Sequence, residues 1–195
     1  AALPREGRIL DVGTGCGVIA LICAQRSRSE VTGIDIHTPS VEEALRNFSL
    51  SPWASRMKGV SVSLQAFSLT RHFDYIISNP PYFRNSLRVA EPSRNDARHC
   101  DRLSYQELLA HARRLINPGG ILGIILPFAE KDSVVSQARD SGWEPMRMLY
   151  VFSKPGPVAL RIAIEFSVSG RSFEPEMLCI CNENGEFSEE YRKLT

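Results

Sequence analysis

The sequence predicts an α/β fold built on a doubly wound, mostly parallel sheet, with antiparallel strands at its C-terminal end. Three observations support this prediction. In the first two thirds of the chain, short apolar runs alternate with longer amphipathic stretches, which is typical of β/α repeats. A glycine-rich turn joins the first apolar run to the first amphipathic stretch. After Trp143 the helical stretches stop, and the apolar runs follow one another directly.

Length and composition limit the classes of protein that remain. The 195 residues are 43% hydrophobic, so we expect a single domain over residues 1–195 with a sizeable core. The formal net charge of +1 is far from the basic excess of a protein that wraps nucleic acid non-specifically. No apolar run approaches the roughly 20 residues that span a bilayer. An odd number of cysteines without a C-x-x-C pair favours a reduced cytoplasm and neither a disulfide framework nor a zinc site; they are Cys16, Cys23, Cys100, Cys179 and Cys181.

Four strands and two helices are predicted before residue 80. The first helix is Val18–Arg26. The second helix begins at Thr38 and Pro39, because threonine is a good N-cap and proline is favoured at the first helical position, and it runs to about residue 50. The predicted strands are short apolar runs at residues 9–12, 31–36, 60–64 and 73–78.

A long loop over residues 84–103 separates the fourth strand from the next helix. Arginines outnumber acids between residues 84 and 114, which suggests a phosphate-rich partner or, equally, a solvated loop. Loops of this length in a compact domain are usually functional or disordered, and we expect this one on the substrate side. It ends at a capping box formed by Ser104 and Glu107, which starts a helix over residues 105–116.

The alternation continues once more after that helix. The run Asn117-Pro118-Gly119-Gly120 stops the helix, because proline and glycine both oppose helical backbone in its interior. A fifth strand follows over residues 121–126. A further helix over about residues 129–141 ends at Gly142, since glycine commonly follows the last helical residue.

Residues 143–195 are expected to hold C-terminal antiparallel strands and a tail. Strands near residues 146–152 and 159–168 should pair antiparallel across Lys154-Pro155-Gly156-Pro157, which reads as a turn. In the second of these strands apolar and polar residues alternate. We therefore expect one buried face and one wet face.

The glycine-rich turn is the first candidate for a binding site. Gly13, Gly15 and Gly17 let the backbone approach a ligand closely, with a tight structural turn as the plain alternative. Their spacing is G-x-G-x-G, whereas dinucleotide sites carry G-x-G-x-x-G, and Asp11 stands where it would repel a pyrophosphate. A hydride-transferring oxidoreductase is therefore disfavoured. S-adenosyl-L-methionine has no phosphate and carries an ammonium and a sulfonium, so an acid there suits it.

A second acid supports the same ligand. Asp35 ends the second strand, where a carboxylate can accept both hydroxyls of a ribose, although a turn-forming acid is the alternative. Asp35 and the run from Leu10 to Gly17 together resemble the class I methyltransferases. The resemblance implies a Rossmann-like fold that takes S-adenosyl-L-methionine and releases S-adenosyl-L-homocysteine. Many members hold the adenine amine with an acid after the third strand, but here backbone groups around Ala66 and Phe67 would have to serve.

The fourth strand breaks into Asn79-Pro80-Pro81-Tyr82-Phe83. In a doubly wound sheet this strand ends beside the first, so these residues should face the sulfonium methyl group, and Asn79 should also touch the cofactor. Asn79 cannot act as a strong base. The acceptor should therefore be an exocyclic or amide NH2, whose two protons the side-chain oxygen of Asn79 and the carbonyl of Pro80 would accept. The nitrogen lone pair would then point at the methyl group.

The neighbouring residues have a role in the same hypothesis. The two prolines keep the turn rigid and, lacking N–H groups, leave carbonyls free to accept. Tyr82 would stack on a planar substrate and assist catalysis, while Pro81 and Phe83 would form the wall of the pocket. Ordinary loop or core packing is the alternative for each aromatic ring.

Asn79-Pro80-Pro81-Tyr82 resembles the signature of amino-group methyltransferases that act on adenine N6, cytosine N4 or glutamine, and it does not choose among them. Longer stretches resemble, in order and spacing, the bacterial tRNA1(Val) (adenine-N6)-methyltransferase family over nearly the whole chain. These stretches are residues 79–83, 97–99 with 103–105, 154–156 and 184–195. The family also carries a further segment before the first strand and a few residues after the position of Thr195, so the resemblance implies trimmed or disordered ends here.

That resemblance implies a tRNA anticodon loop as partner, with the target adenine beside the anticodon, no membrane and no metal, and a monomer or weak dimer. A base in a single-stranded loop costs less to extrude than a base in a duplex. A structural ion pair is an equal alternative for Arg98, and a loop contact is an equal alternative for His99. His37 and His111 look like surface residues. The implied RNA contacts are Arg84, Arg88, Arg94, Arg98 and His99 at the entrance, and Lys154 on the far side.

Two alternatives stay open. One keeps the chemistry and moves it to a glutamine side chain of a protein such as a release factor. Enzymes of that kind usually carry a helical domain ahead of the core, and we expect none here. The other is a non-catalytic RNA-binding module on the same scaffold. An eroded site should have lost Asn79 or the glycines, and the sequence retains both.

Overall fold

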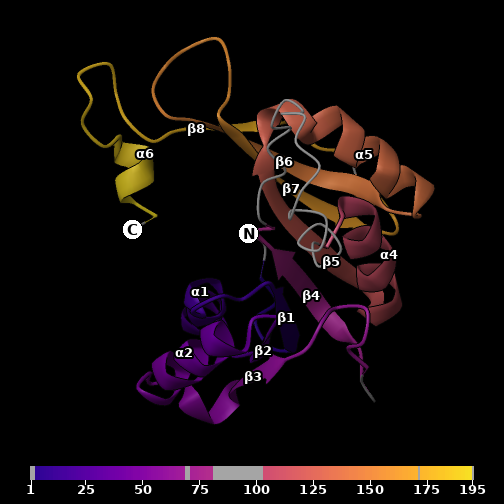
Figure 1. Ribbon diagram of the computed structural model, residues 1–195. Helices are drawn as coiled ribbons and strands as arrows, with labels where there is room; N and C mark the ends of the chain where they lie inside the picture. The colour runs from indigo at the N-terminus through magenta and orange to yellow at the C-terminus, as the bar shows by residue number, and fades with distance from the viewer. Residues whose placement is uncertain (1–2, 69–70, 81–102, 171, 195) are drawn as a thin grey trace, which may run out of the picture.

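The computed structural model describes residues 3–68, 71–80, 103–170 and 172–194 (Figure 1). Within these residues an eight-stranded sheet has the order β3-β2-β1-β4-β5-β7-β6-β8. The strands are β1 (Arg8–Val12), β2 (Glu30–Asp35), β3 (Met57–Ser61), β4 (Phe73–Ser78), β5 (Ile116–Pro127), β6 (Glu144–Phe152), β7 (Arg161–Ser167) and β8 (Glu176–Cys179). The helices are α1 (Val18–Arg26), α2 (Thr38–Ser49), α4 (Tyr105–Leu115), α5 (Lys131–Asp140) and α6 (Glu189–Arg192), with 3-10 turns η1 (Ala54–Arg56) and η2 (Phe128–Glu130).

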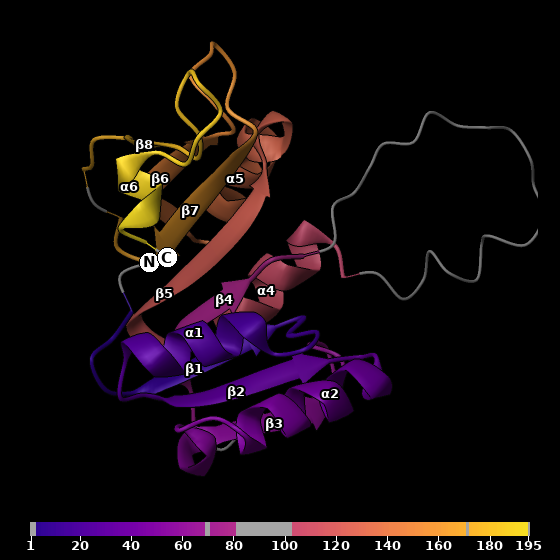
Figure 2. The ribbon, with the colours of Figure 1, turned by 90° about the vertical axis from the view of Figure 1, so that its left-hand side faces the viewer.

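The sheet has helices on both faces, as a doubly wound fold requires. α1 and α2 lie on one face and α4 and α5 on the other, as Figures 1 and 2 show from two sides. β3, β2, β1, β4 and β5 run parallel, and β7 runs antiparallel to both β5 and β6. The predicted fold class, a mostly parallel doubly wound sheet with antiparallel strands at the C-terminal end, is confirmed. None of the helices in the described ranges has the length and apolar character needed to cross a membrane.

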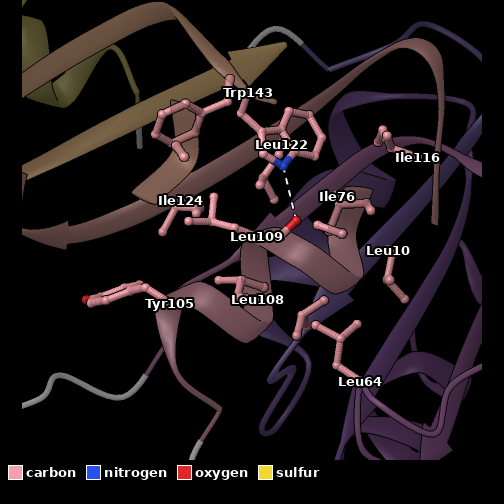
Figure 3. Close-up of a cluster of buried hydrophobic side chains, with 14 of the residues drawn as sticks. Leu10, Leu64, Ile76, Tyr105, Leu108, Leu109, Ile116, Leu122, Ile124 and Trp143 are labelled. Atoms are coloured by element: carbon pink, nitrogen blue, oxygen red, sulfur yellow. Dashed lines mark hydrogen bonds between the residues drawn. The ribbon is translucent and has the colours of Figure 1, made fainter. Parts of the chain in front are cut away.

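Alternating strand residues supply the two cores. Leu10 and Ile76 belong to the cluster under α4 and α5, whereas their neighbours Ile9 and Tyr75 belong to the cluster under α1 and α2. The centre of the first cluster contains Trp143, whose indole N–H donates to the Leu109 carbonyl oxygen at 3.1 Å (Figure 3). A large apolar side chain is thus buried without leaving its polar atom unsatisfied.

The third strand lies three residues earlier than the sequence predicted. The expected bounds of 60–64 are wrong, because β3 runs over Met57–Ser61 and pairs in parallel with β2 from Val31 to Asp35. Lys58 and Gly59 weaken the local strand pattern. Gly59 is nevertheless suited to this place, since a Cβ there would lie 3.1 Å from the Leu45 side chain of α2. Packing of α2 therefore sets this strand more strongly than local propensity does.

Two helix boundaries and the start of the fifth strand also differ from the prediction. α4 ends at Leu115, and the run from Asn117 to Gly120, expected as a helix stop, lies inside β5 as an irregularity. There the pairing shifts from Phe73↔Ile116 to Tyr75↔Ile121. The last expected helix, 129–141, is divided into the 3-10 turn η2 and α5, which ends at Asp140.

The C-terminal region confirms one expectation and corrects others. β6 and β7 pair antiparallel, as predicted, but β8 pairs parallel with β6, so antiparallel strands do not account for the whole of residues 143–195. The region also contains the short helix α6. The expected wet face of the strand at 159–168 is wrong at Glu165 and Ser167, which are both buried. The Glu165 side chain is covered by two others on the same face of the sheet, since it accepts a hydrogen bond from Tyr75 of β4 and lies against Arg147 of β6.

The strand directions bring several segments to one edge of the sheet, which we call the carboxyl edge. Val12 pairs with Ser78, so β1 and β4 end side by side. Ser78 in turn pairs with Ile124, and β5 continues three residues farther, to Pro127. Pro127 pairs with Arg161, the first residue of β7. The turn between β6 and β7 therefore lies at the same edge.

Candidate functional site

The glycine turn occupies the carboxyl edge between β1 and α1. Gly13, Gly15 and Gly17 have φ values of +73°, +55° and +86°, in the left-handed region that favours glycine. A Cβ at Gly13 or Gly15 would meet nothing within 4 Å, so space is open above the turn. At Gly17 a Cβ would lie 2.5 Å from the ring of Phe48. The first two glycines therefore leave room for a ligand, while the third lets α1 pack against α2.

Asp11 lies beneath this turn and is fully buried. Its Oδ2 accepts hydrogen bonds from the Thr14 hydroxyl at 2.7 Å and from the Ala20 N–H at 3.1 Å, which ties the turn to α1. Among the described residues, Oδ1 has no hydrogen-bond partner. Burial raises the pKa of Asp11 to about 6, and the nearby charge of Asp35 adds to the rise. Burying a carboxylate oxygen without a hydrogen-bond partner costs free energy, and a hydrogen bond from a cationic group would offset that cost.

Asp35 links the glycine turn to the start of α2. Its Oδ2 accepts from the Gly15 N–H at 3.0 Å, and its Oδ1 accepts from the His37 N–H at 2.9 Å. Each carboxylate oxygen has a further lone pair, so the group can hold the turn and still accept from a hydroxyl. Ile36, which the sequence reasoning missed, is 56% exposed beside it. An isoleucine next to a strand end is common, so the sequence offers no specific signal for it.

The turn after β3 holds Ala66 and Phe67. Ala66 is exposed, and its N–H donates to the Ser63 hydroxyl at 3.2 Å. Phe67 is buried, its N–H donates to the Ser63 carbonyl oxygen at 2.9 Å, and its ring stacks on Phe73. Arg114 of α4 donates to the Phe67 carbonyl oxygen at 2.9 Å. The N–H groups of both residues are thus engaged inside the turn, and the Phe67 ring belongs to the core.

Asn79 and Pro80 follow directly on the end of β4. Asn79 is exposed and Pro80 is buried. Because Ser78 pairs with Val12, Asn79 leaves the sheet beside Gly13, where the glycine turn begins. The structure therefore brings the Asn79 segment and the glycine turn to adjacent positions on the carboxyl edge.

The remaining predicted residues divide into two groups. Lys154 is exposed in the turn between β6 and β7, at the carboxyl edge. His37 is exposed, and its Nδ1 lies 2.8 Å from the Ser40 hydroxyl, as suits a surface residue. The other predicted substrate residues lie outside the described residues; these are Pro81, Tyr82, Phe83, Arg84, Arg88, Arg94, Arg98 and His99.

The histidine, cysteine and acidic side chains are dispersed over the part of the chain that the structure describes. There, no three histidine, cysteine, aspartate or glutamate side chains gather closely enough to hold a metal ion together. Four cysteines are described and are free thiols: Cys16, Cys23, Cys179 and Cys181. Burial raises the pKa of the Cys23 thiol to about 12, which keeps it protonated and unreactive.

Comparison with known proteins agrees with this arrangement. The family model for the methyltransferase small domain matches residues 1–133. A tRNA1(Val) (adenine(37)-N6)-methyltransferase from Bacteroides fragilis is 38% identical over 193 residues, which cover 97% of this chain and 81% of that protein. A protein of the same name from Edwardsiella ictaluri is 36% identical over 200 residues, which cover 100% of this chain and 81% of its own length.

Solved structures share the fold at lower identity. A predicted O-methyltransferase from Agrobacterium tumefaciens superposes with a TM-score of 0.71 at 18% identity, covering 96% of this chain and 88% of that one. A glycopeptide N-methyltransferase in complex with (S)-adenosyl-L-methionine superposes with a TM-score of 0.61 at 15% identity, covering 84% and 82%. At these identities the similarity shows the fold alone.

Proposed function

We propose, from the premise that this chain belongs to the methyltransferase small domain family and to the tRNA1(Val) (adenine(37)-N6)-methyltransferases, that it methylates the N6 amine of an adenine in a tRNA anticodon loop. The adenine is the one next to the anticodon of tRNA1(Val), and the methyl donor is S-adenosyl-L-methionine. One observation carries the proposal. An open glycine turn with an unsatisfied buried acid beneath it adjoins the Asn79 segment on one sheet edge.

The residues of this edge fit the methyl donor. Asp11 Oδ1 is a buried acceptor without a partner among the described residues, which suits the ammonium of the donor. Asp35 would accept from the ribose hydroxyls, and Ile36 offers an exposed apolar surface to the nucleobase. We propose that backbone groups around Ala66 and Phe67 complete the adenine pocket. The bound donor supplies a methyl group on a sulfonium.

Asn79 and Pro80 orient the acceptor. The side-chain oxygen of Asn79 and the carbonyl oxygen of Pro80 accept the two protons of the adenine amine, which draws its lone pair out of conjugation with the ring. Since neither group is a strong base, the rate gain comes from alignment and fixed dipoles. The amine proton leaves to solvent after transfer, when the nitrogen carries a positive charge and is strongly acidic.

The substrate side of the proposal involves residues on both flanks of Asn79. We propose that Tyr82 stacks on the adenine, a contact worth about 1–3 kcal/mol, and that Pro81 and Phe83 form the wall of its pocket. We propose phosphate contacts for Lys154 and for the arginine-rich segment, through Arg84, Arg88, Arg94, Arg98 and His99. The free thiols of the described cysteines suit a cytoplasmic enzyme, which we expect to be a monomer or weak dimer.

The test is methyl transfer from labelled S-adenosyl-L-methionine to bulk unmodified tRNA, with mass spectrometry of the nucleosides before and after. We expect N6-methyladenosine in the anticodon loop. The Asn79→Ala variant should keep its cofactor affinity nearly unchanged and lose about 100-fold or more in turnover. Label on a release-factor glutamine with none in tRNA would reject the proposed substrate, and full turnover in Asn79→Ala would remove Asn79 from the mechanism.

A further inference from the structure

Ser78 lies between the two halves of the site, which are the glycine turn after β1 and the Asn79 segment after β4. The proposed mechanism gives this residue no role. Its hydroxyl donates to the Val12 carbonyl oxygen at 2.9 Å. Both residues are buried, with 1% and 4% of their surface exposed. A buried carbonyl needs a partner, and the hydroxyl supplies one where the two strands end.

The position of this bond distinguishes it from an ordinary buried contact. Val12 is the last residue of β1 and precedes the glycine turn, and Ser78 is the last residue of β4 and precedes Asn79. The N–H groups of Gly13 and Thr14 donate to the Ile34 carbonyl oxygen at 2.9 and 3.0 Å, so the chain after Val12 turns toward β2. The Ser78 hydroxyl thus bonds β4 to Val12, at the point where the chain bends away from β4 into the glycine turn.

We infer that Ser78 is a positioning residue for the methyl transfer, and this inference rests on the proposed function. The donor is held by the segment after Val12, and the acceptor amine is held by the segment after Ser78. The distance between the reacting atoms therefore depends on how these two strand ends are fixed to each other. A misplacement of about 1 Å can cost about 100-fold in rate. The hydroxyl contributes by fixing that spacing, not by touching either substrate.

Ser27 provides a matched control. It is also buried, and its hydroxyl donates to a backbone carbonyl oxygen, that of Cys23, at 2.8 Å. It follows the last residue of α1, away from the carboxyl edge. Ser27→Ala and Ser78→Ala therefore both remove a hydrogen bond from a buried hydroxyl to a backbone carbonyl oxygen, one remote from the site and one between its halves. Ser27→Ala also removes the bond that the Ser29 N–H donates to this hydroxyl at 3.3 Å, so its cost in stability should be at least as large.

The experiment compares both variants with the wild type in kcat, in KM for tRNA and in affinity for S-adenosyl-L-homocysteine. Ser78→Ala should lower kcat about tenfold while KM and affinity stay within about twofold, because each half of the site is intact. Ser27→Ala should leave kcat, KM and the affinity unchanged, even if it lowers the melting temperature as much as Ser78→Ala does. A bisubstrate analogue that links the cofactor skeleton to adenosine N6 should bind Ser78→Ala about tenfold more weakly than wild type.

Two failures can be told apart. If the wild type methylates tRNA and Ser78→Ala keeps its kcat and its affinity for the bisubstrate analogue, the inference about Ser78 is wrong and the proposed function stands. Equal losses of kcat in Ser78→Ala and Ser27→Ala would contradict the positioning role, because they would show that Ser78 contributes only to general stability. If the wild type methylates no tRNA adenine, the proposed function fails and the inference fails with it.

Discussion

Two buried carboxylates, one in each half of the molecule, have opposite surroundings. Glu165 of β7 accepts from the Tyr75 hydroxyl at 2.8 Å and lies 3.8 Å from a guanidinium nitrogen of Arg147. Asp11 of β1 accepts only from a neutral hydroxyl and a backbone N–H, and it forms no salt bridge within the described residues. The residues that the structure describes thus supply a cation to Glu165 and none to Asp11.

On the proposed function, the difference separates a structural carboxylate, Glu165, from one that would serve a ligand, Asp11. Arg147 also binds Glu176 through two hydrogen bonds of 2.6 and 2.7 Å, so one guanidinium group lies between the carboxylates of Glu165 and Glu176. Burial, with the charge of Glu165, raises the pKa of Tyr75 above its usual range and keeps it a neutral donor. Buried charges are normally paired, so on the proposed function we expect the charge of Asp11 to attract a cation bound above the glycine turn.

The largest expected effect is on the structural side of the comparison. Glu165→Ala should lower the free energy of unfolding by about 3–5 kcal/mol, because it leaves the Tyr75 hydroxyl and part of the Arg147 charge without their buried partner. Urea denaturation measures the loss. Glu176→Ala is the control, since this exposed pair should contribute about 1 kcal/mol or less. Affinity of the folded protein for S-adenosyl-L-homocysteine should not change in either variant, and a large drop in Glu165→Ala would break the comparison.

Stability of the ligand-free protein should depend on pH through Asp11. Its folded-state pKa of about 6 lies above the ordinary value of 3.8, so the folded state holds the proton more tightly than the unfolded state. The resulting stabilisation is fully present below pH 3.8 and is lost as the pH rises through about 6. It amounts to about 3 kcal/mol. Denaturation across pH 4–7, with Asp11→Asn as reference, should show this loss only in the wild type.

The functional side of the comparison is tested by Asp11→Asn. The amide keeps an oxygen for Thr14 and Ala20 but removes the charge that would meet an ammonium. Cofactor affinity at pH 7.5 should fall about 10- to 100-fold, as expected for the loss of a charge-assisted hydrogen bond. Isothermal titration calorimetry measures this change. Asp74→Asn, at the opposite edge where the carboxylate accepts from Asn117, should leave the affinity unchanged.

The smallest expected effect concerns the space that the structural network needs. A Cβ on Gly123 would lie 2.5 Å from the Tyr75 hydroxyl oxygen. Gly123→Ala should therefore lower the free energy of unfolding by about 1–2 kcal/mol through overpacking, measured by thermal or urea denaturation. Gly119→Ala is not a suitable control because of its positive φ, whereas Gly156→Ala has room and should be neutral. A neutral Gly123→Ala would show that Tyr75 can move away from Glu165 at no cost.

Local patterns were sufficient for some elements and not for others. β4 and α1 have the predicted bounds, because each is a clear apolar run with distinct ends: Asn79 and Pro80 follow β4, and Gly17 and Ser27 flank α1. β3 was misplaced because its register depends on β2 and α2, and the direction of β8 has no local signal at all. The hydrogen bond between Tyr75 and Glu165 joins residues 90 positions apart, and the local sequence of neither segment predicts this contact.

The candidate site shows the same division. The glycine spacing, Asp11, Asp35 and Asn79 could be selected from the sequence, because their chemistry depends on residue type and on position after a strand. The hydrogen bonds that these side chains form within the protein could not be predicted from the sequence. The sequence assigned Asp11 to the cofactor alone, whereas its Oδ2 also holds the turn together. Ser78 and Ile36 were missed because a serine or an isoleucine at a strand end is common and has no specific signature.

The unequal lengths of β4 and β5 have a consequence for what can reach Asn79. β5 continues for three residues beyond the partner of Ser78, which is about 10 Å of strand, and β7 supports this extension. Asn79 and Pro80 therefore leave the sheet beside a strand that continues past them. If the proposed tRNA substrate is correct, its target base has to pass this longer strand to meet Asn79. A nucleotide that projects from its polymer would do so more readily than a paired one.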